Sequence, residues 1–409
     1  MRRHVVTAAK TTWDQRATLR PAPFSGPLSR LVRGVHVGDA LFDALPAGDV
    51  CCHGGKCRTK VSLGDAPAWV DWAKVRRGQA VFNEHLGQFF VALSVALLQG
   101  FSIARFAEVL HANGYAQSPV TAYERYQATG FAIVDWMAHP LDEPGSLAVE
   151  QARNVRAMHS FARRRAIASG LFPHPEEEGI PLSQFDVAIT LLGFAGVAPS
   201  IVESELGAAP LAREDREALC HVWRLLGFYA GILDEFNPCN SLDEMEAMVL
   251  EFLSFTPTFF ATCRPCTFDL QASALQGFGM YTGVGVEFFV GVLHSTCAAR
   301  GFEIDYLKRK SIWGMRLVGA DSLRLLGYRP VNALVSAALR FQRARWLDDA
   351  ASQRKLLPVL RAASLPMDLV VWRVAGAQAA VVNSWWGRLL IFVLLARRAA
   401  RVAARRGWV

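Results

Sequence analysis

One histidine lies among five arginines in the stretch RNVRAMHSFARRR, residues 153–165. An unperturbed imidazole has a pKa of about 6.5, and its neutral form is the commonest metal ligand among side chains. Guanidinium groups stay positively charged and bind carboxylates. The stretch therefore combines a candidate metal ligand, His159, with candidate anion-binding groups at i−3 and i+4, Arg156 and Arg163.

Residues 146–169 are predicted to form one helix, with Ser146 as its N-cap. The other residues on the face of His159 are all small and apolar: Ala148, Ala152, Val155, Ala162 and Ala166. Such a wall fits a flat, apolar disc that carries a metal at its centre and negative groups on its rim. A haem has that shape and charge. The alternative is a close contact between helices, with His159 hydrogen-bonded in the core.

A second predicted helix, within 118–137, has a stripe of the same kind: Ala122, Arg125, Ala128, Thr129 and Ala132. Burying Arg125 on an apolar stripe is costly unless it meets an anion or a hydrogen-bond acceptor. A haem carboxylate, an oxygen species or a helix carboxylate such as Asp186 would serve. A purely structural ion pair inside the bundle is the alternative.

The order and spacing of these residues resemble a known family. The pattern RxxxT (Arg125 to Thr129), followed by RxxHxxxR (Arg156, His159, Arg163), is similar to the latex clearing proteins. These are haem b rubber oxygenases, whose relatives include the membrane-bound, mpaB-type oxygenase of mycophenolic acid biosynthesis. Similarity continues through residues 69–82, 182–194 and 223–238, so that it covers about residues 66–330.

The resemblance implies an all-α haem b enzyme whose helices stack around a haem pocket as in globins. It makes His159 the proximal ligand of the iron and Arg125 and Thr129 catalytic residues beside the haem. Arg156 and Arg163 would hold the propionates or brace the ligand helix. The implied reaction is oxidative cleavage of a carbon–carbon double bond with dioxygen, in an isoprenoid or lipid-like hydrophobic substrate.

The sequence departs from this family in three places. Some rubber oxygenases have a lysine before the threonine of RxxxT, where this chain has Ala128, so the distal side is expected to be open. The family's glutamate base corresponds most nearly to Glu108, which lies 51 residues before His159, with His111 one turn further on. An exposed helix carboxylate is the alternative for Glu108. Because no export signal is evident, an intracellular lipid or terpenoid is expected rather than polymeric rubber.

Composition and charge bound the remaining choices. The 409 residues are 52% hydrophobic with a mean hydropathy of +0.19, and the formal net charge is +8. Residues 388–409 hold six arginines and no acid, which leaves the body nearly neutral. We therefore expect no nucleic-acid partner. Residues 384–406 would contact an anionic membrane surface peripherally, or would simply form a solvated helix end. The protein is expected to be cytoplasmic or peripherally membrane-associated.

Helical periodicity predicts an all-α fold with one main domain. An irregular N-terminal extension is expected over 1–65, a haem-binding helical domain over 66–350, and a basic helical region over 351–409. The cysteines of CCHGGKC (51–57) and CRPC (263–266) are too far apart for an ordinary zinc site. A haem or lipid carrier without catalysis, or a membrane-associated scaffold without a cofactor, are the other classes that fit. Helices are predicted over 79–98, 102–113, 117–137, 146–169, 182–194, 199–206, 212–232, 241–254, 267–298, 303–325, 330–346, 354–362 and 370–404.

Overall fold

The computed structural model describes residues 4–6, 20–39, 66–114, 116–204, 210–282, 286–299, 302–304 and 336. These residues all belong to the first of two compact units, Met1–Ser311 with Arg316–Arg343. The predicted helices over 330–346, 354–362 and 370–404, apart from residue 336, lie outside the described residues, and so do the basic region 351–409 and residues 384–406.

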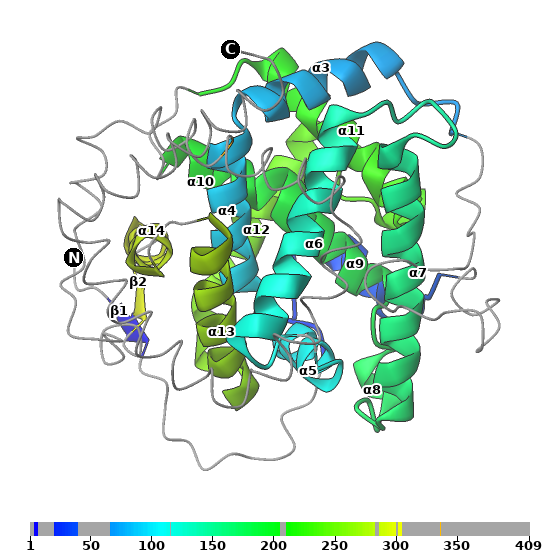
Figure 1. The fold of residues 1–409 in the computed structure, drawn as a ribbon. Coiled ribbons are helices and arrows are strands. Elements are labelled where there is room, and N and C mark those ends of the chain that lie inside the picture. The colour runs from blue at the N-terminus through cyan, green and yellow to red at the C-terminus, as the bar shows by residue number, and fades with distance from the viewer. Residues whose placement is uncertain are drawn as a thin grey trace, which may run out of the picture. The chain divides into compact units, whose positions relative to one another are not determined.

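The described part of the chain is an all-α fold with one small two-stranded ribbon (Figure 1). The main helices are α3 (Trp72–Glu84), α4 (Leu86–Gly100), α5 (Ala104–Ala112), α6 (Pro119–Ala138), α7 (Leu147–Ala168), α9 (Gln184–Leu192), α10 (Ala198–Ser204), α11 (Arg213–Tyr229), α12 (Leu242–Ala261), α13 (Pro265–Thr282) and α14 (Val286–Ala299). Shorter elements are α1 (Ser29–Val32), η1 (Arg33–His36), α8 (Pro175–Glu178) and η3 (Asp234–Phe236).

The helix starts follow the capping chemistry of the sequence. The Ser146 hydroxyl accepts a hydrogen bond from the Val149 N–H at 3.2 Å, which confirms the predicted N-cap of α7. Ser118 and Thr121 form a capping box at the start of α6, where Pro119 occupies the first turn. Side-chain oxygens at both starts thus satisfy backbone donors that a helix leaves unpaired.

Several boundaries differ from the predictions. The helix expected over 79–98 is two helices, α3 and α4, which bend by 87° at His85. The helix expected over 267–298 is divided into α13 and α14. The helix expected from 303 is wrong at its start, because Phe302–Ile304 (β2) pairs in parallel with His4–Val6 (β1). Region 1–65 is accordingly not irregular throughout, since it contains β1, α1 and η1.

One long apolar run crosses the centre of the bundle. Helices α9 and α10 are joined by a π-helical turn, Gly193–Val197, into one helix over Gln184–Ser204. By length and composition this run could span a membrane, but 67% of its apolar window is buried inside the protein. A long, apolar and mostly buried helix is also typical of the core of a helical bundle. The bent α3–α4 pair is long and apolar enough to span a membrane only if the two helices are taken as one span.

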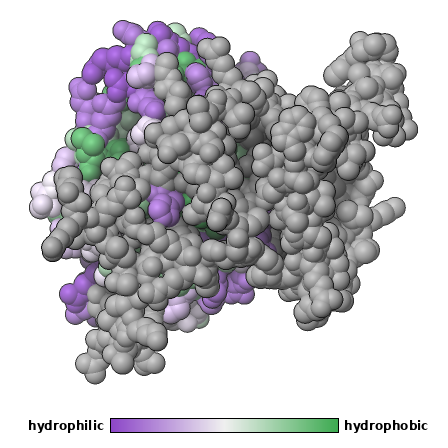
Figure 2. Space-filling model, turned by 90° about the vertical axis from the view of Figure 1, so that its left-hand side faces the viewer, coloured by the Kyte–Doolittle hydropathy of each residue, from purple (hydrophilic) through white to green (hydrophobic). Residues whose placement is uncertain are grey.

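The core between α3, α4 and α11 is aromatic. The rings of Phe82 and Phe89 stack with centroids 4.6 Å apart, and Trp223 meets Phe82 edge-on at 6.1 Å. Burial of these large rings contributes much of the hydrophobic stabilisation. On the face drawn in Figure 2 the coloured, described residues are mostly hydrophilic, with a few isolated apolar side chains.

Candidate functional site

Helices α6 and α7 lie side by side and carry five of the six predicted site residues. Helix α6 packs between α13 and α7, and the segment 139–146 connects it directly to α7 (Figure 1). The stripe of Arg125 and the stripe of His159 therefore lie on two antiparallel helices that are neighbours in both sequence and space.

His159 is held in its neutral form. Burial lowers the pKa of His159 to about 4, the positive charge of Arg125 lowers it too, and the negative charge of Asp39 opposes both. The Nδ1 atom is buried and forms no hydrogen bond with any described residue. The residue as a whole nevertheless keeps an intermediate accessible surface. A neutral imidazole that is desolvated yet still accessible is suited to coordinate a metal.

The wall around His159 is as small and apolar as the sequence predicts. Ala148, Ala152 and Ala166 are buried, whereas Val155 and Ala162, on either side of the histidine, keep intermediate exposure. The centre of this stripe is therefore less tightly covered than its two ends.

Arg125 on α6 faces the same region. Its charge acts on both His159 and Tyr126, and it forms no ion pair with any described carboxylate. The suggested pairing with Asp186 is wrong, since that carboxylate is bonded to Arg105. The Thr129 hydroxyl donates to the backbone oxygen of Arg125 at 3.1 Å, and the intervening Ala128 is exposed.

Arg156 and Arg163, at i−3 and i+4 from His159 on α7, are buried and contact the N-terminal segment. Arg156 Nε–H and Nη2–H donate to the two carboxylate oxygens of Asp39 at 2.8 and 2.9 Å. The Arg163 guanidinium lies against Gly38, where an added Cβ would come within 2.2 Å of it. These contacts brace α7 against the N-terminal segment, and the role of Arg156 in holding a propionate stays a prediction.

Neither Glu108 nor His111 on α5 forms a contact with His159 or Arg125 that the structure describes. Glu108 Oε1 forms an ion pair with Arg264 Nε at 3.2 Å, and His111 is exposed. The sequence anticipated neither the arginine partner of Glu108 nor its location, because Arg264 follows 156 residues later.

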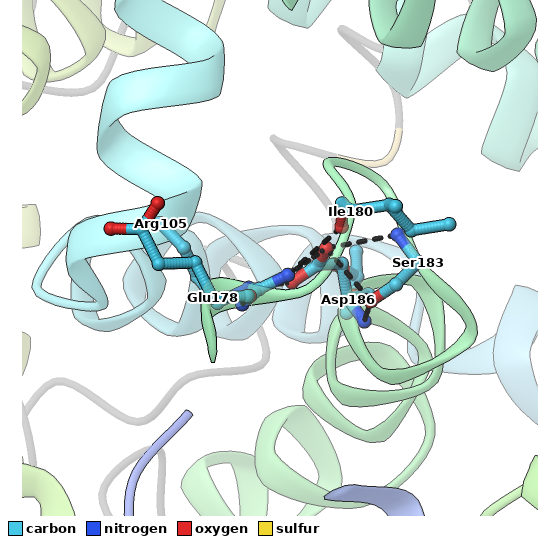
Figure 3. Close-up of polar contacts among 6 residues, drawn as sticks. Arg105, Glu178, Ile180, Ser183 and Asp186 are labelled. Carbon is cyan, nitrogen blue, oxygen red and sulfur yellow. Dashed lines mark hydrogen bonds and ion pairs between the residues drawn. The ribbon is translucent and has the colours of Figure 1, made fainter. Parts of the chain in front are cut away.

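A third buried arginine, Arg105, which the sequence analysis missed, holds the loop before α9 (Figure 3). Arg105 Nη1–H donates to the Glu178 carbonyl at 2.7 Å, and Nη2–H donates to the Ile180 carbonyl at 3.0 Å and to Asp186 Oδ2 at 2.9 Å. Asp186 in turn accepts from the Ser183 N–H at 2.9 Å. The cluster fixes the start of α9 on α5 and has a structural role.

Other candidate sites are not supported. The described residues contain no group of three or more potential metal-ligating side chains, and Cys263 and Cys266 are buried thiols. The CCHGGKC motif lies outside the described residues. A surface groove of about 420 Å³ runs between α10 and α12, beside Ser200, Leu250 and Pro257. Neither of these two helices carries a predicted site residue. The residues on α6 and α7 therefore remain the better candidate for a functional site than the groove.

Comparison with known proteins gives one solved structure. No family model and no curated protein matches the chain. The chain is similar to a latex clearing protein, LCP, in its closed state, with 18% sequence identity and a TM-score of 0.49 over 68% of this chain and 76% of that one. A likeness of this degree identifies neither a ligand nor a reaction for this chain.

Proposed function

We propose that the protein is a haem b-dependent oxygenase that cleaves a carbon–carbon double bond in a hydrophobic, isoprenoid- or lipid-like substrate. The observation that carries the proposal is the neutral imidazole of His159, which projects from a wall of small residues beside the charge of Arg125. This is the donor chemistry that would hold a haem iron.

The residues present fit such a group. Val155, His159 and Ala162 all keep intermediate exposure, so the centre of the stripe is not fully covered. The Nδ1 atom, which forms no hydrogen bond with any described residue, is a buried polar atom that needs a partner or a change of protonation. Metal ligation at the other ring nitrogen would fix the tautomer and make Nδ1 the donor.

Each residue then has a distinct task. His159 would hold the iron, and bound haem would supply the redox chemistry with dioxygen. Arg125 would hold a positive charge beside the reacting centre, where it stabilises negative charge that develops during the reaction. Ala128 and the other small residues of α6 would leave room for an alkene chain. Thr129, whose hydroxyl donates to the backbone oxygen of Arg125, would present the lone pairs of that hydroxyl to the site.

Two measurements on the purified chain test the ligand assignment: a haem titration followed by absorbance, and a pyridine haemochrome assay. His159→Ala removes the imidazole, and His174→Ala is the matched control, because His174 is an exposed histidine on the loop before α8. Wild type and the control should bind one haem per chain with the same Soret band. A His159→Ala protein with an unchanged band and unchanged affinity would overturn the assignment.

A haem or lipid carrier without turnover is the second candidate. It is favoured by the ion pair between Glu108 and Arg264, which occupies the one carboxylate that the sequence offers as a base. Dioxygen consumption by the haem-loaded protein with an unsaturated lipid separates the two functions. Consumption with a cleaved product supports the oxygenase, and binding without consumption supports the carrier.

A further inference from the structure

Residues 20–39, hereafter the strap, run across several helices before they reach α7. The Glu251 carboxylate of α12 accepts hydrogen bonds from the backbone N–H groups of Gly26 at 2.7 Å and Leu28 at 2.8 Å. The side chains of Leu28 and Leu31 are fully buried. The strap is therefore part of the packed fold and not a loosely attached extension.

The second half of the strap is fastened to the start of α9. The Val35 carbonyl accepts from the Ile180 N–H at 3.0 Å, and the Val37 carbonyl accepts from the Gln184 N–H at 2.8 Å. The Gln184 side chain also donates to the Gly38 carbonyl at 3.3 Å. These bonds fix the backbone that leads directly into Asp39.

The strap ends on α7 at Asp39. The residue with which Asp39 pairs, Arg156, lies three residues before His159. The Asp39 carboxylate is 7% exposed and receives two nearly parallel N–H bonds from Arg156. A bidentate pair fixes direction as well as distance, and a buried one is costly to break because the remaining charge is left unpaired.

Two glycines make this close approach possible. At Gly231, whose φ is +91°, an added Cβ would lie 2.1 Å from Asp39 Oδ2. At Gly38, an added Cβ would lie 2.2 Å from Arg163 Nη2. The strap thus contacts α7 at two arginines, one on each side of His159 along the helix, and both contacts depend on the absence of a side chain.

We propose that Asp39 is a positioning residue for His159: by holding Arg156 in a bidentate pair, the strap sets the rotation and position of α7 and so the direction in which the imidazole meets its metal. This inference rests on the proposed haem function. Asp39 also contributes a negative charge near the ring, opposite in effect to Arg125. A carboxylate that acts on a metal ligand through its supporting structure is a common arrangement, and its loss typically lowers metal affinity by about 10- to 100-fold.

The test uses the full chain loaded with haem b and two variants. Asp39→Asn keeps the shape of the side chain and removes its charge, and Arg156→Lys keeps the charge but cannot form two parallel bonds. Glu177→Gln is the control, because it breaks the exposed pair with Arg20 at the other end of the strap. The readouts are the rate of haem transfer to an acceptor globin and the iron–imidazole band in resonance Raman spectra.

We expect both variants to lose haem about 10- to 100-fold faster and to shift the iron–imidazole band, with the control unchanged. Hydrogen exchange of α7 in the haem-free chain should rise in the same two variants, which gives a readout that does not depend on the ligand. A wild-type chain that binds no haem would overturn the proposed function itself. A wild type ligated through His159, with both variants unchanged in band and rate, would overturn only the role of Asp39.

Discussion

The buried pair of Arg105 and Asp186 gives the sharpest test of how the scaffold is held. The Arg105 side chain is 1% exposed, and its guanidinium donates to Asp186 and to two backbone carbonyls of the preceding loop. Asp186→Asn is nearly isosteric and can still accept from the Ser183 N–H. The substitution therefore removes the negative charge while most of the local geometry is kept.

The expected cost follows from the charge that is left behind. Breaking a buried ion pair by removing one partner costs about 3–5 kcal/mol, because the other charge stays desolvated. Arg105 keeps its two carbonyl acceptors, which places the expected loss in unfolding free energy near the lower end, about 3 kcal/mol. A loss of this size is a large fraction of the roughly 5–15 kcal/mol that stabilises a typical folded domain.

Urea denaturation followed by circular dichroism measures this loss. The control is Glu217→Gln, which breaks an exposed i,i+4 pair with Arg213 and should leave the midpoint unchanged. In a double-mutant cycle, Arg105→Met with Asp186→Asn should cost less than the sum of the single variants, since neither charge is then orphaned. It should not return to wild type, because the Glu178 and Ile180 carbonyls lose their donor. An Asp186→Asn midpoint equal to that of the control would refute the reasoning.

Three further outcomes are expected. The pKa of His159 is lowered to about 4 from an ordinary value of 6.5, so the unfolded chain takes up this proton first as pH falls. The haem-free wild type should therefore lose roughly 3 kcal/mol of unfolding free energy between pH 6.5 and 4 relative to His159→Gln, measured by denaturation at each pH, and parallel profiles would contradict the burial of the ring. Gly231→Ala should lower the melting temperature clearly, because its Cβ would meet Asp39 at 2.1 Å, whereas Gly100→Ala, with nothing within 4 Å, should not; equal melting temperatures would argue against the close approach of the strap. If residues 384–406 contact membranes, the chain should sediment with anionic vesicles at low salt and not with neutral ones, and replacement of Arg397, Arg398, Arg401, Arg405 and Arg406 by Gln should abolish this, whereas equal sedimentation with both vesicle types would contradict an electrostatic contact.

Short-range pattern was enough to predict α6, α7 and the stripe of His159. Ser146 and Ser118 cap helices through bonds that span three residues, and the spacing of alanines around His159 depends only on helical geometry. Because one short connection makes α6 and α7 neighbours, the sequence also brought Arg125 near His159. The helix breaks at His85, where α3 and α4 diverge by 87°, and no comparable short-range pattern in the sequence predicts this break.

What the sequence by itself determined, then, is the class of the fold and the face on which His159 projects, since both follow from the helical period of apolar residues. Only the tertiary structure decided the partners of the charged residues. Asp39 meets Arg156 across 117 positions, Arg105 meets Asp186 across 81, and Glu108 meets Arg264 across 156. The free energy of a buried ion pair depends on the desolvation of both charges and on the relative orientation of the two side chains. Neither can be predicted from the spacing of residues along the chain.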